Sequence, residues 1–259
     1  MTVISFGHLT SPQIREVAAG LVVVQPIGAT EQHGPHLPVL TDTIVAESVA
    51  IAAAEHSTAE CAVLPTLAYG RSGEHRGFPG TISLSTSTLL AVCMELGSSL
   101  AASGVSKLVF VNGHGGQPHA LEVVARDIRA ACGLQVFVTT PMRAGVPAGW
   151  DVTDAEYGIH AGQVETSVML ALAPDLVHMN VAAADGHGAH AAFAACDHLT
   201  LEGATPTAWL TEDFSATGVF GDPGAATVEL GRAVLEHWTT VTAATLTEIA
   251  TFRMPGGSR

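Results

Sequence analysis

The segment Leu21-Val22-Val23-Val24-Gln25-Pro26-Ile27 decides the fold class of this chain. It is a short apolar run rich in β-branched residues, which is typical of a buried strand. Gly28 follows directly, and Gly34-Pro35 interrupts regular structure again a few residues later. The run therefore predicts a strand inside a sheet, with a loop at the carboxyl end of that strand.

The loop after this strand is rich in side chains that bind metals. It contains Glu31, His33 and His36 and leads on to Asp42. Glu31 and His33 are two residues apart, so they point the same way in an extended segment, and Asp42 can close back on both after a turn. Carboxylates with imidazoles suit a divalent ion such as Zn²⁺ or Mn²⁺, and open α/β sheets place ligands at strand carboxyl ends. The alternative is a solvated polar loop whose histidines bond only to backbone.

A second polar turn, Asn112-Gly113-His114-Gly115-Gly116, follows the apolar run 107–111. The next stretch, 118–131, predicts a helix with proline in its first turn. A glycine-rich turn of this kind can cradle an anion, but its spacing fits neither the dinucleotide motif nor the P-loop. The first strand is not followed by GxGxxG either, which argues against an NAD-type Rossmann oxidoreductase. We therefore predict that His114 is a metal ligand.

A third segment, His160-Ala161-Gly162-Gln163-Val164-Glu165, leads into a helix predicted over 165–172. Glu165 lies in the first turn of that helix, where the helix dipole favours a carboxylate even without a further role. His160 has no comparable structural reason, and its ordinary pKa near neutrality suits proton transfer. We predict that His160 and Glu165 are catalytic, and that Glu165 either binds metal or orients His160.

Predicted helices and strands alternate along the chain. The predicted strands are 21–27, 62–67, 107–111 and 135–139, and the predicted helices are a short one from residue 11 that Gly20 ends, 43–55, 85–102, 118–131 and 165–172. This alternation is typical of a parallel sheet covered by helices. We expect an α/β fold with three layers, a mostly parallel β-sheet flanked by helices, and a single domain over residues 1–259.

The composition indicates a globular protein and limits its partners. Of the 259 residues, 47% are apolar and 13% are charged, which argues against disorder. The formal net charge is −14 with only ten Lys and Arg, so neither nucleic acid nor an anionic membrane is an expected partner.

We predict that the four cysteines are buried thiols and form no disulfide framework: Cys61, Cys93, Cys132 and Cys196. No apolar stretch reaches the roughly 18 residues of a membrane span, and residues 1–4 lack a basic secretory start, so we expect a cytoplasmic location.

Together these segments resemble the creatininase (creatinine amidohydrolase) family. The resemblance rests on the segment 31–38 with Asp42, on 112–116 and on 160–167, and the segments 72–84 and 218–223 agree with it. The matches run in the expected order from about residue 21 to residue 229. The resemblance implies a layered α/β fold with a hydrolytic site for two divalent metal ions, which would be Zn, Mn or Fe. It also implies a homo-oligomer, a hexamer.

The resemblance further implies a role for each matched residue. Glu31, Asp42 and His114 match the ligands of one metal ion, and His33 and Asp42 match ligands of the second, so that Asp42 bridges both ions. His160 matches the residue that is usually assigned the proton transfer. The implied reaction is hydrolysis of a C–N amide bond by a metal-activated water, with a small amide or a short peptide as substrate. A rival of another class is a non-catalytic metal-binding protein, but glycines around carboxylate ligands indicate open coordination positions.

One departure from the creatininase pattern concerns the substrate. Creatininase proper has a carboxylate two residues after the histidine of its Asn-Gly-His motif, whereas this chain has Gly116. Either Glu165 completes the second metal site, or that site is weaker. The family also contains deformylases of a pyrimidine cofactor precursor and the peptidase of mycofactocin maturation, which removes a C-terminal dipeptide from a small precursor peptide. The segments 69–75, 160–163 and 215–223 most resemble this peptidase, although 78–80 has the form of the wider family.

Two long stretches, 141–158 and 180–221, show no regular pattern, which is typical of functional or mobile segments. They contain Trp150 and Trp209. One of these rings would cover the substrate; the alternative is that both are ordinary aromatic side chains packed against the rest of the protein. Glu74 and His75 lie in a matched segment. We place them near the site or at a subunit contact and assign them no chemistry.

Overall fold

The computed structural model describes residues 4–255. Its centre is a five-stranded sheet with the strand order β1-β3-β2-β4-β5, in which all neighbouring strands run parallel. The strands are β1 (Ile4–Ser5), β2 (Val22–Ile27), β3 (Cys61–Val63), β4 (Lys107–Asn112) and β5 (Gln135–Thr139). The predicted fold class is therefore confirmed.

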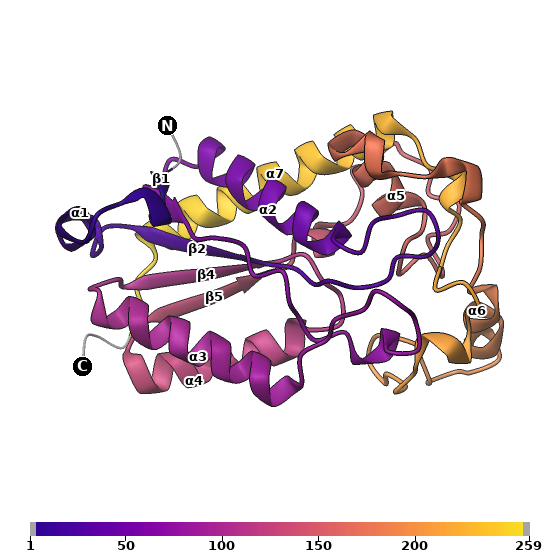
Figure 1. Ribbon diagram of the computed structural model, residues 1–259, viewed down its shortest axis with the longest axis horizontal. Helices are drawn as coiled ribbons and strands as arrows, with labels where there is room; N and C mark the ends of the chain where they lie inside the picture. Colours follow the sequence, from indigo (N-terminus) through magenta and orange to yellow (C-terminus); the bar gives the residue numbers. More distant parts are fainter. Residues whose placement is uncertain (1–3, 256–259) are drawn as a thin grey trace.

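Helices cover both faces of this sheet (Figure 1). One face carries α2 (Thr41–His56) and α7 (Val228–Thr251), and the other carries α3 (Thr86–Ala102) and α4 (Pro118–Cys132). The helix α1 (Ser11–Val17) precedes β2, whereas α5 (Gln163–Leu172) and α6 (His187–Ala194) lie beyond the carboxyl ends of the strands. Short 3₁₀ helices lie between these elements: η1 (Phe6–His8), η2 (Gly73–His75), η3 (Pro141–Ala144), η4 (Pro174–Leu176), η5 (Met179–Val181), η6 (Thr211–Asp213) and η7 (Pro223–Ala225).

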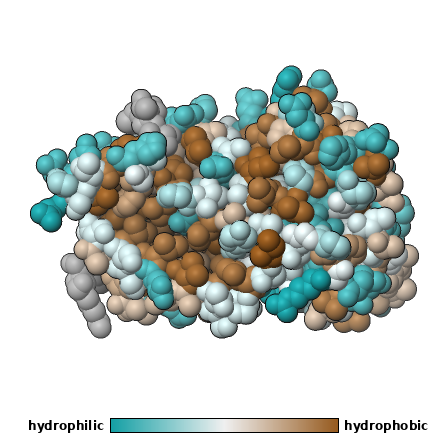
Figure 2. Space-filling model, viewed as in Figure 1, coloured by the Kyte–Doolittle hydropathy of each residue, from teal (hydrophilic) through white to brown (hydrophobic). Residues whose placement is uncertain are grey.

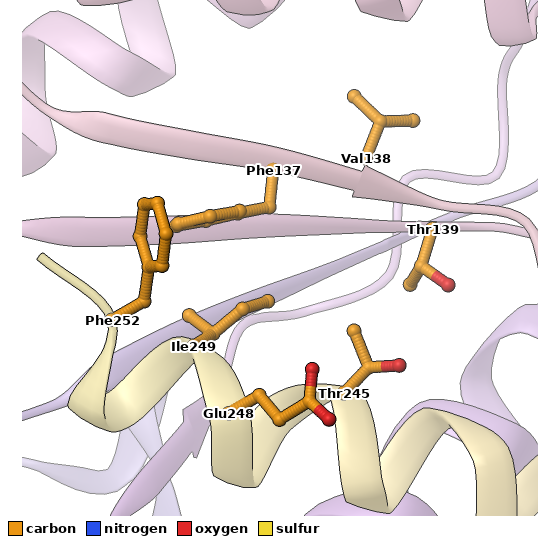
Figure 3. A pocket seen from close by; sticks show the side chains of 7 residues that line it. All are labelled: Phe137, Val138, Thr139, Thr245, Glu248, Ile249 and Phe252. Atoms are coloured by element: carbon orange, nitrogen blue, oxygen red, sulfur yellow. The ribbon is translucent and has the colours of Figure 1, made fainter. Parts of the chain in front are cut away.

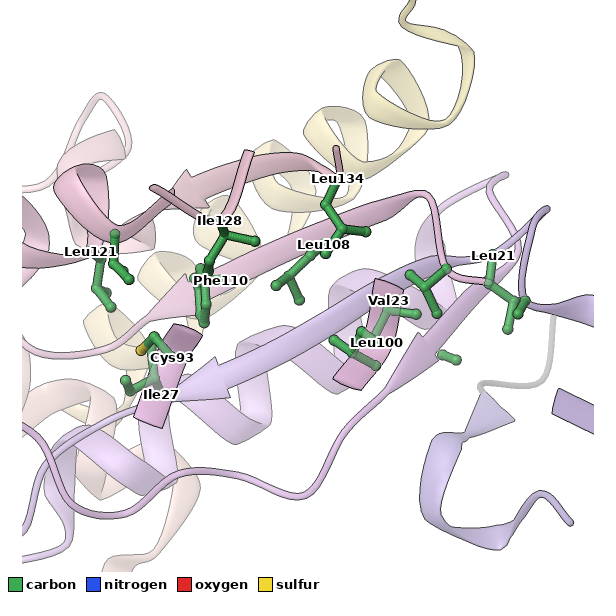
Figure 4. Close-up of a cluster of buried hydrophobic side chains, with 14 of the residues drawn as sticks. Leu21, Val23, Ile27, Cys93, Leu100, Leu108, Phe110, Leu121, Ile128 and Leu134 are labelled. Carbon is green, nitrogen blue, oxygen red and sulfur yellow. The ribbon is translucent and has the colours of Figure 1, made fainter. Parts of the chain in front are cut away.

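The central strands β2 and β4 are buried along their whole length, which explains their nearly unbroken apolar sequences. Successive side chains of a strand point to opposite faces of the sheet. Val23 and Phe110 therefore pack toward α3 and α4 (Figure 4), whereas Val22 and Val109 pack toward α2 and α7. The hydrophobic core is thus divided by the sheet into two layers.

A close approach at Gly28 places the start of α2 beside the end of β2. A Cβ atom on Gly28 would lie 2.5 Å from the Cα atom of Thr43, so no side chain fits there. The helix α2 begins at Thr41, two residues before the predicted start, and Asp42 therefore lies in its first turn. The helix dipole favours a carboxylate at this position. In the same way α5 begins at Gln163 and not at Glu165.

Four further elements, β3, α6, β1 and α7, differ from the prediction. The strand β3 ends at Val63 and does not reach residue 67, because Pro26 in the facing part of β2 has no backbone N–H to donate to β3. Hydrogen bonds from Leu64 and Leu67 to the carbonyls of β2 continue the pairing only in part. The stretch 180–221 contains α6, which the sequence pattern did not predict. The prediction also included neither β1 nor α7.

The cysteines are all free, as predicted, but they are not all buried. Cys61 and Cys93 lie in the core, Cys132 is half-buried and Cys196 is exposed. Cys196 follows the end of α6, in the part of the chain where the sequence pattern indicated no regular structure. The prediction of four buried thiols was therefore wrong for Cys132 and Cys196.

The edge of the sheet at β5 is apolar and hollowed. Figure 2 shows the opposite side of the molecule, where hydrophobic side chains gather between α2 and α3. A cavity of about 280 Å³ lies between β5 and α7 (Figure 3), and its lining includes Phe137, Ile249 and Phe252. The rings of Phe137 and Phe252 meet edge to face with their centroids 6.1 Å apart. This hollow is separate from the polar cluster described below.

A third apolar cluster lies beyond the sheet, among α2, α5 and α7. It includes Val49, Val168, Leu230 and Trp238. Because α7 packs against both α2 and α5, it connects the sheet with the segments beyond the strand ends, and we propose that residues 1–259 form one domain. Among residues 4–255, no helix is long and apolar enough to cross a membrane.

Candidate metal centre

Buried carboxylates and imidazoles gather at the carboxyl ends of β2 and β4. Glu31 and His33 follow β2, Asp42 lies at the start of α2, and His114 follows β4. Each of these side chains is at most 3% exposed. The chain continues from β2 to β3 on one side and later returns to β4 on the other, so the cluster lies at a topological switch point, where open α/β sheets bind ligands. The structure thus brings four of the five predicted ligands together here, and the fifth, Glu165, is described below.

The hydrogen-bond partners of His33 show which ring nitrogen carries the hydrogen and which has the lone pair. Nδ1 lies 3.0 Å from the carbonyl oxygen of Glu31, which can only accept, so Nδ1 carries a hydrogen. Nε2 faces Asp42 Oδ1 at 3.1 Å. In a neutral imidazole this nitrogen has only a lone pair, and it faces an oxygen that also has only lone pairs. The pair therefore requires a second proton or a cation.

In His114, too, a nitrogen with a lone pair faces a carboxylate oxygen. Its Nε2 donates to the carbonyl oxygen of Arg71 at 2.9 Å, so the lone pair of the neutral ring is on Nδ1. That nitrogen lies 3.0 Å from Asp42 Oδ2. Asn112 holds the turn in place, because its amide donates to the carbonyl of His114 at 2.8 Å and its carbonyl accepts from the backbone N–H of His114. The two oxygens of Asp42 thus face two different imidazoles.

The donor atoms of the cluster fit a divalent cation. Glu31 Oε1 and Oε2 and Asp42 Oδ2 are buried without a hydrogen-bond partner. Donor atoms of Glu31, Asp42 and His114 all lie within 4.8 Å of one another. Ligands of a zinc ion, at about 2.0–2.2 Å from the metal, are roughly 3–3.5 Å apart, and the 3.0 Å between His114 Nδ1 and Asp42 Oδ2 is of this size.

The shifted pKa values of the cluster also indicate that positive charge stabilises it. Burial opposes protonation of His33, but Asp42 outweighs it and raises the pKa of His33 to about 10. Burial is likewise outweighed at His114, where Glu31 and Asp42 raise the pKa to about 10. Burial raises the pKa of Glu31 to about 7. It acts on Asp42 in the same direction, but His33 and His114 hold the pKa of Asp42 well below its ordinary value. A bound cation would displace these protons and supply the charge instead.

His160 lies beside these residues and offers one free nitrogen. Its Nε2 donates to the carbonyl oxygen of Gln32 at 2.8 Å, so Nδ1 has the lone pair, and Nδ1 faces Glu31 Oε1 at 3.5 Å. Burial, together with the nearby His33 and His75, lowers the pKa of His160 well below its ordinary value. The ring is therefore neutral near pH 7.

A strained turn fixes His160 and Glu165. Ala161 has a φ angle of 54°, and among residues 4–255 it is the only non-glycine residue with a positive φ, which costs roughly 1–2 kcal/mol. Its backbone N–H donates to Glu165 Oε2 at 2.5 Å. Donor atoms of His33, His160 and Glu165 form a second group within 4.8 Å of one another, and burial raises the pKa of Glu165. The two residues predicted to be catalytic thus both border the cluster.

His75, to which the sequence analysis assigned no role, belongs to the cluster. It lies at the end of η2, is 3% exposed, and its Nε2 is 3.2 Å from Glu31 Oε1. Its ring lies against that of His160, with the centroids 4.3 Å apart. Burial and the neighbouring His33 and His114 lower the pKa of His75 to about 3. The signal in the sequence was the pair Glu74-His75 inside a matched segment.

Of the two tryptophans in the irregular stretches, Trp209 lies near the cluster. Its ring is perpendicular to that of His75 with the centroids 6.3 Å apart, and it also packs against Phe220. Trp150 is 42% exposed. Trp209 is therefore the tryptophan that covers this side of the cluster.

The space beside Gly116 is occupied by another carboxylate. A Cβ atom on residue 116 would collide with the carboxylate of Glu74 and crowd His114. Glu74 is held there by Arg71, whose Nη1 lies 2.7 Å from its Oε2. Glu74 is not among the residues whose donor atoms have the spacing of metal ligands, so Glu165 is the additional carboxylate that borders the predicted ligands.

Fold and site together define the class of this protein. It is a parallel α/β protein with a buried carboxylate and imidazole centre, suited to divalent cations, at the carboxyl edge of its sheet. The family model of creatinine amidohydrolase (creatininase) matches residues 7–246. The chain therefore belongs to the creatininase family, as its motifs indicated, and it is an amidohydrolase that acts on C–N bonds.

Curated relatives and solved structures agree with this assignment. The chain is 38% identical over 243 residues to the mycofactocin precursor peptide peptidase of Mycolicibacterium smegmatis, covering 88% of this chain and 84% of the relative. It is 34% identical over 200 residues to the creatinine amidohydrolase of Pseudomonas putida, covering 67% and 74%.

Among solved structures, a mutant creatininase of Zn-Zn type has a TM-score of 0.71 and 29% identity, with 96% of this chain and 98% of that chain covered. A creatininase described with Mn has a TM-score of 0.72 and 26% identity, with 95% and 98% covered.

Proposed function

We propose that this protein is a divalent-metal-dependent peptidase that removes a C-terminal dipeptide from a small precursor peptide, as in mycofactocin maturation. The observation that carries the proposal is its 38% identity, over 88% of the chain, to a relative named mycofactocin precursor peptide peptidase. Similarity to the creatinine amidohydrolase of Pseudomonas putida covers only 67% of the chain. Gly116, which stands where creatininase proper has a ligand carboxylate, also argues against creatinine as the substrate.

In this proposal Glu31, Asp42 and His114 hold one ion, and His33, Asp42 and Glu165 hold a second, with Zn, Mn or Fe as the metals. When bound, such ions lower the pKa of water and polarise a carbonyl oxygen. Asp42 is suited to serve both ions, because its Oδ1 faces His33 and its Oδ2 faces His114. Glu31 and Asp42 are ionised when a cation is present, so the carboxylates offset its charge in a site from which water is largely excluded.

His160 transfers the proton in the proposed reaction. Water adds to the carbonyl carbon of the scissile amide, the C–N bond breaks, and the leaving nitrogen must gain a proton. The free Nδ1 of His160 faces the cluster, while its Nε2–H is tied to the carbonyl of Gln32. The ring can therefore accept a proton from the attacking water and deliver it to the leaving nitrogen at the same atom. The products are a carboxylate and an amine.

The experiment combines metal analysis with an assay on two substrates. Protein purified without chelator is expected to contain up to two divalent ions per chain, and to release C-terminal dipeptides from synthetic peptides detected by mass spectrometry. A chelator should stop the release, and Zn²⁺, Mn²⁺ or Fe²⁺ should restore it. The Asp42→Ala variant serves as the control for contaminating peptidases. Turnover of creatinine without peptide cleavage would favour the cyclic-amide alternative, and protein that contains and takes up no divalent metal would contradict the metal site.

We also expect a homo-oligomer, a hexamer, as the family resemblance implies. The edge of the sheet at β5 and the apolar hollow beside it offer a surface on which a second copy of the chain can pack. Light scattering at micromolar concentration should give the mass of the assembly, and a monomer would contradict the prediction. A Phe252→Glu variant that remains fully assembled would place the subunit contact elsewhere. The cytoplasmic location stays a prediction.

A further inference from the structure

Gln32 is a buried amide whose orientation is fixed by two backbone partners. Its Oε1 accepts from the backbone N–H of Gly34 at 2.9 Å, and its Nε2 donates to the carbonyl oxygen of Gly218 at 3.0 Å. A backbone N–H can only donate and a carbonyl can only accept, so the two ends of the amide cannot be exchanged. The side chain is 4% exposed. Gln32 therefore presents an N–H donor, in a fixed direction, to any further neighbour of its Nε2.

The further neighbour that can accept this N–H is His75, because His160 Nε2, at 3.2 Å from Gln32 Nε2, itself donates to the carbonyl oxygen of Gln32. Gln32 Nε2 lies 2.8 Å from His75 Nδ1, and because an amide nitrogen only donates, Nδ1 must accept. The hydroxyl of Thr211 also lies 2.8 Å from Nδ1 and donates either to it or to the carbonyl of Glu74. The hydrogen of the neutral His75 ring is consequently on Nε2, the nitrogen that lies 3.2 Å from Glu31 Oε1.

This tautomer decides between two roles for His75. Its Nε2 has the spacing of a metal ligand with Glu31 and His160, but a nitrogen that carries a hydrogen has no lone pair for a cation. The same N–H is a donor close to a carboxylate oxygen that has no hydrogen-bond partner of its own. His75 is therefore suited to hold Glu31 and unsuited to bind metal directly.

We propose that His75 is a positioning residue: its Nε2–H holds Oε1 of Glu31 so that Oε2 remains directed toward His114 and Asp42, and Gln32 sets the direction of this N–H. The inference rests on the proposed role of Glu31 as a metal ligand. Partners that orient metal ligands in this way typically contribute about 10–100-fold to metal affinity.

The test measures zinc affinity of the full-length protein by competition with a chromophoric chelator. His75→Phe removes the donor, whereas His75→Gln places an amide N–H near the former Nε2. We expect the zinc affinity to fall about 10–100-fold in His75→Phe, to stay near the wild-type value in His75→Gln, and to fall in Gln32→Leu. His237→Phe and His237→Gln are the matched controls, because within residues 4–255 the ring of His237 on α7 bonds only to the carbonyl of Ala144. Both controls should bind zinc like the wild type.

The possible results distinguish a failure of the proposed metal site from a failure of the positioning role of His75. Wild-type protein that binds no zinc would contradict the proposed metal site itself, before any variant is compared. Wild-type binding with an unchanged affinity in folded His75→Phe would overturn the positioning role. If His75→Gln loses as much affinity as His75→Phe, or if both lose a whole equivalent of metal, His75 is a ligand. If His75→Phe does not fold, Gln32→Leu and His75→Gln test the proposal instead. Gln32→Leu removes the donor to Nδ1 and should lose zinc affinity, whereas His75→Gln keeps an N–H toward Glu31 and should retain it.

Discussion

Replacing Asp42 by alanine is expected to abolish metal binding and hydrolysis together. Both oxygens of this carboxylate face imidazoles, at 3.1 Å from His33 Nε2 and 3.0 Å from His114 Nδ1. No other carboxylate of the cluster contacts both rings, so its loss leaves His33 and His114 without the charge that joins them. The position in the first turn of α2 adds the favourable field of the helix dipole. Activity should therefore fall to the background level.

Two further variants make this result specific. Asp42→Asn keeps the shape of the side chain but removes its charge, and we expect it to lose metal as Asp42→Ala does. Asp127→Ala, at an exposed position on α4, should retain both metal and activity. Elemental analysis gives the metal content, and circular dichroism shows whether each variant is folded. A folded Asp42→Ala protein that still holds two ions per chain would show that Asp42 bridges nothing.

The second large effect is expected at His160, where rate and metal content should separate. His160→Ala is expected to keep nearly all of its metal and to reduce the rate by roughly 10²–10⁴, which is the usual contribution of a positioned acid or base. The reason is geometric: the Nδ1 of His160 is free and faces the cluster, while its other nitrogen is bonded to the backbone of Gln32.

The same variant tests the other role that the structure allows for His160. Its donor atom has the spacing of a metal ligand with His33 and Glu165, and also with Glu31 and His75. If His160→Ala loses its metal as Asp42→Ala does, His160 is a ligand, and Glu165 becomes the next candidate for proton transfer. Measuring the metal content and the rate on the same preparation distinguishes the two roles.

The sheet could be predicted from sequence because its strands are buried on both faces. The strands β2 and β4 are apolar runs followed by glycine, and β5 was predicted with its observed bounds. The strand β3 was predicted too long, since the apolar residues continue past Pro65 although the regular pairing does not. The helix α7 has a capping signal, because the side chain of Thr227 accepts from the backbone N–H of Leu230. Its many β-branched residues make it a weaker helix by propensity, and packing against α2 and α5 stabilises it.

The candidate site was predictable where its residues follow strands, and not where they are brought in by irregular segments. Glu31 and His114 follow β2 and β4, whose carboxyl ends meet at one edge of the sheet, so their proximity follows from the fold class. His75 reaches the cluster on the short helix η2, which no periodic pattern predicts, and it is surrounded by Gln32 and Thr211 from distant parts of the chain. Such contacts are tertiary, and a single sequence does not encode them in any local pattern.

The separation of the candidate ligands along the chain has a consequence for folding. Glu31, His114 and Glu165 belong to three segments that meet only after β4 and α5 have docked, so the unfolded chain has no comparable site for a cation. A cation that binds only the native state adds its binding free energy to the stability of the fold, about 2.7 kcal/mol when its free concentration is 100 times the dissociation constant. The melting temperature of this enzyme should therefore rise with free metal concentration and fall when a chelator is added, so that metal supply and resistance to unfolding are thermodynamically linked.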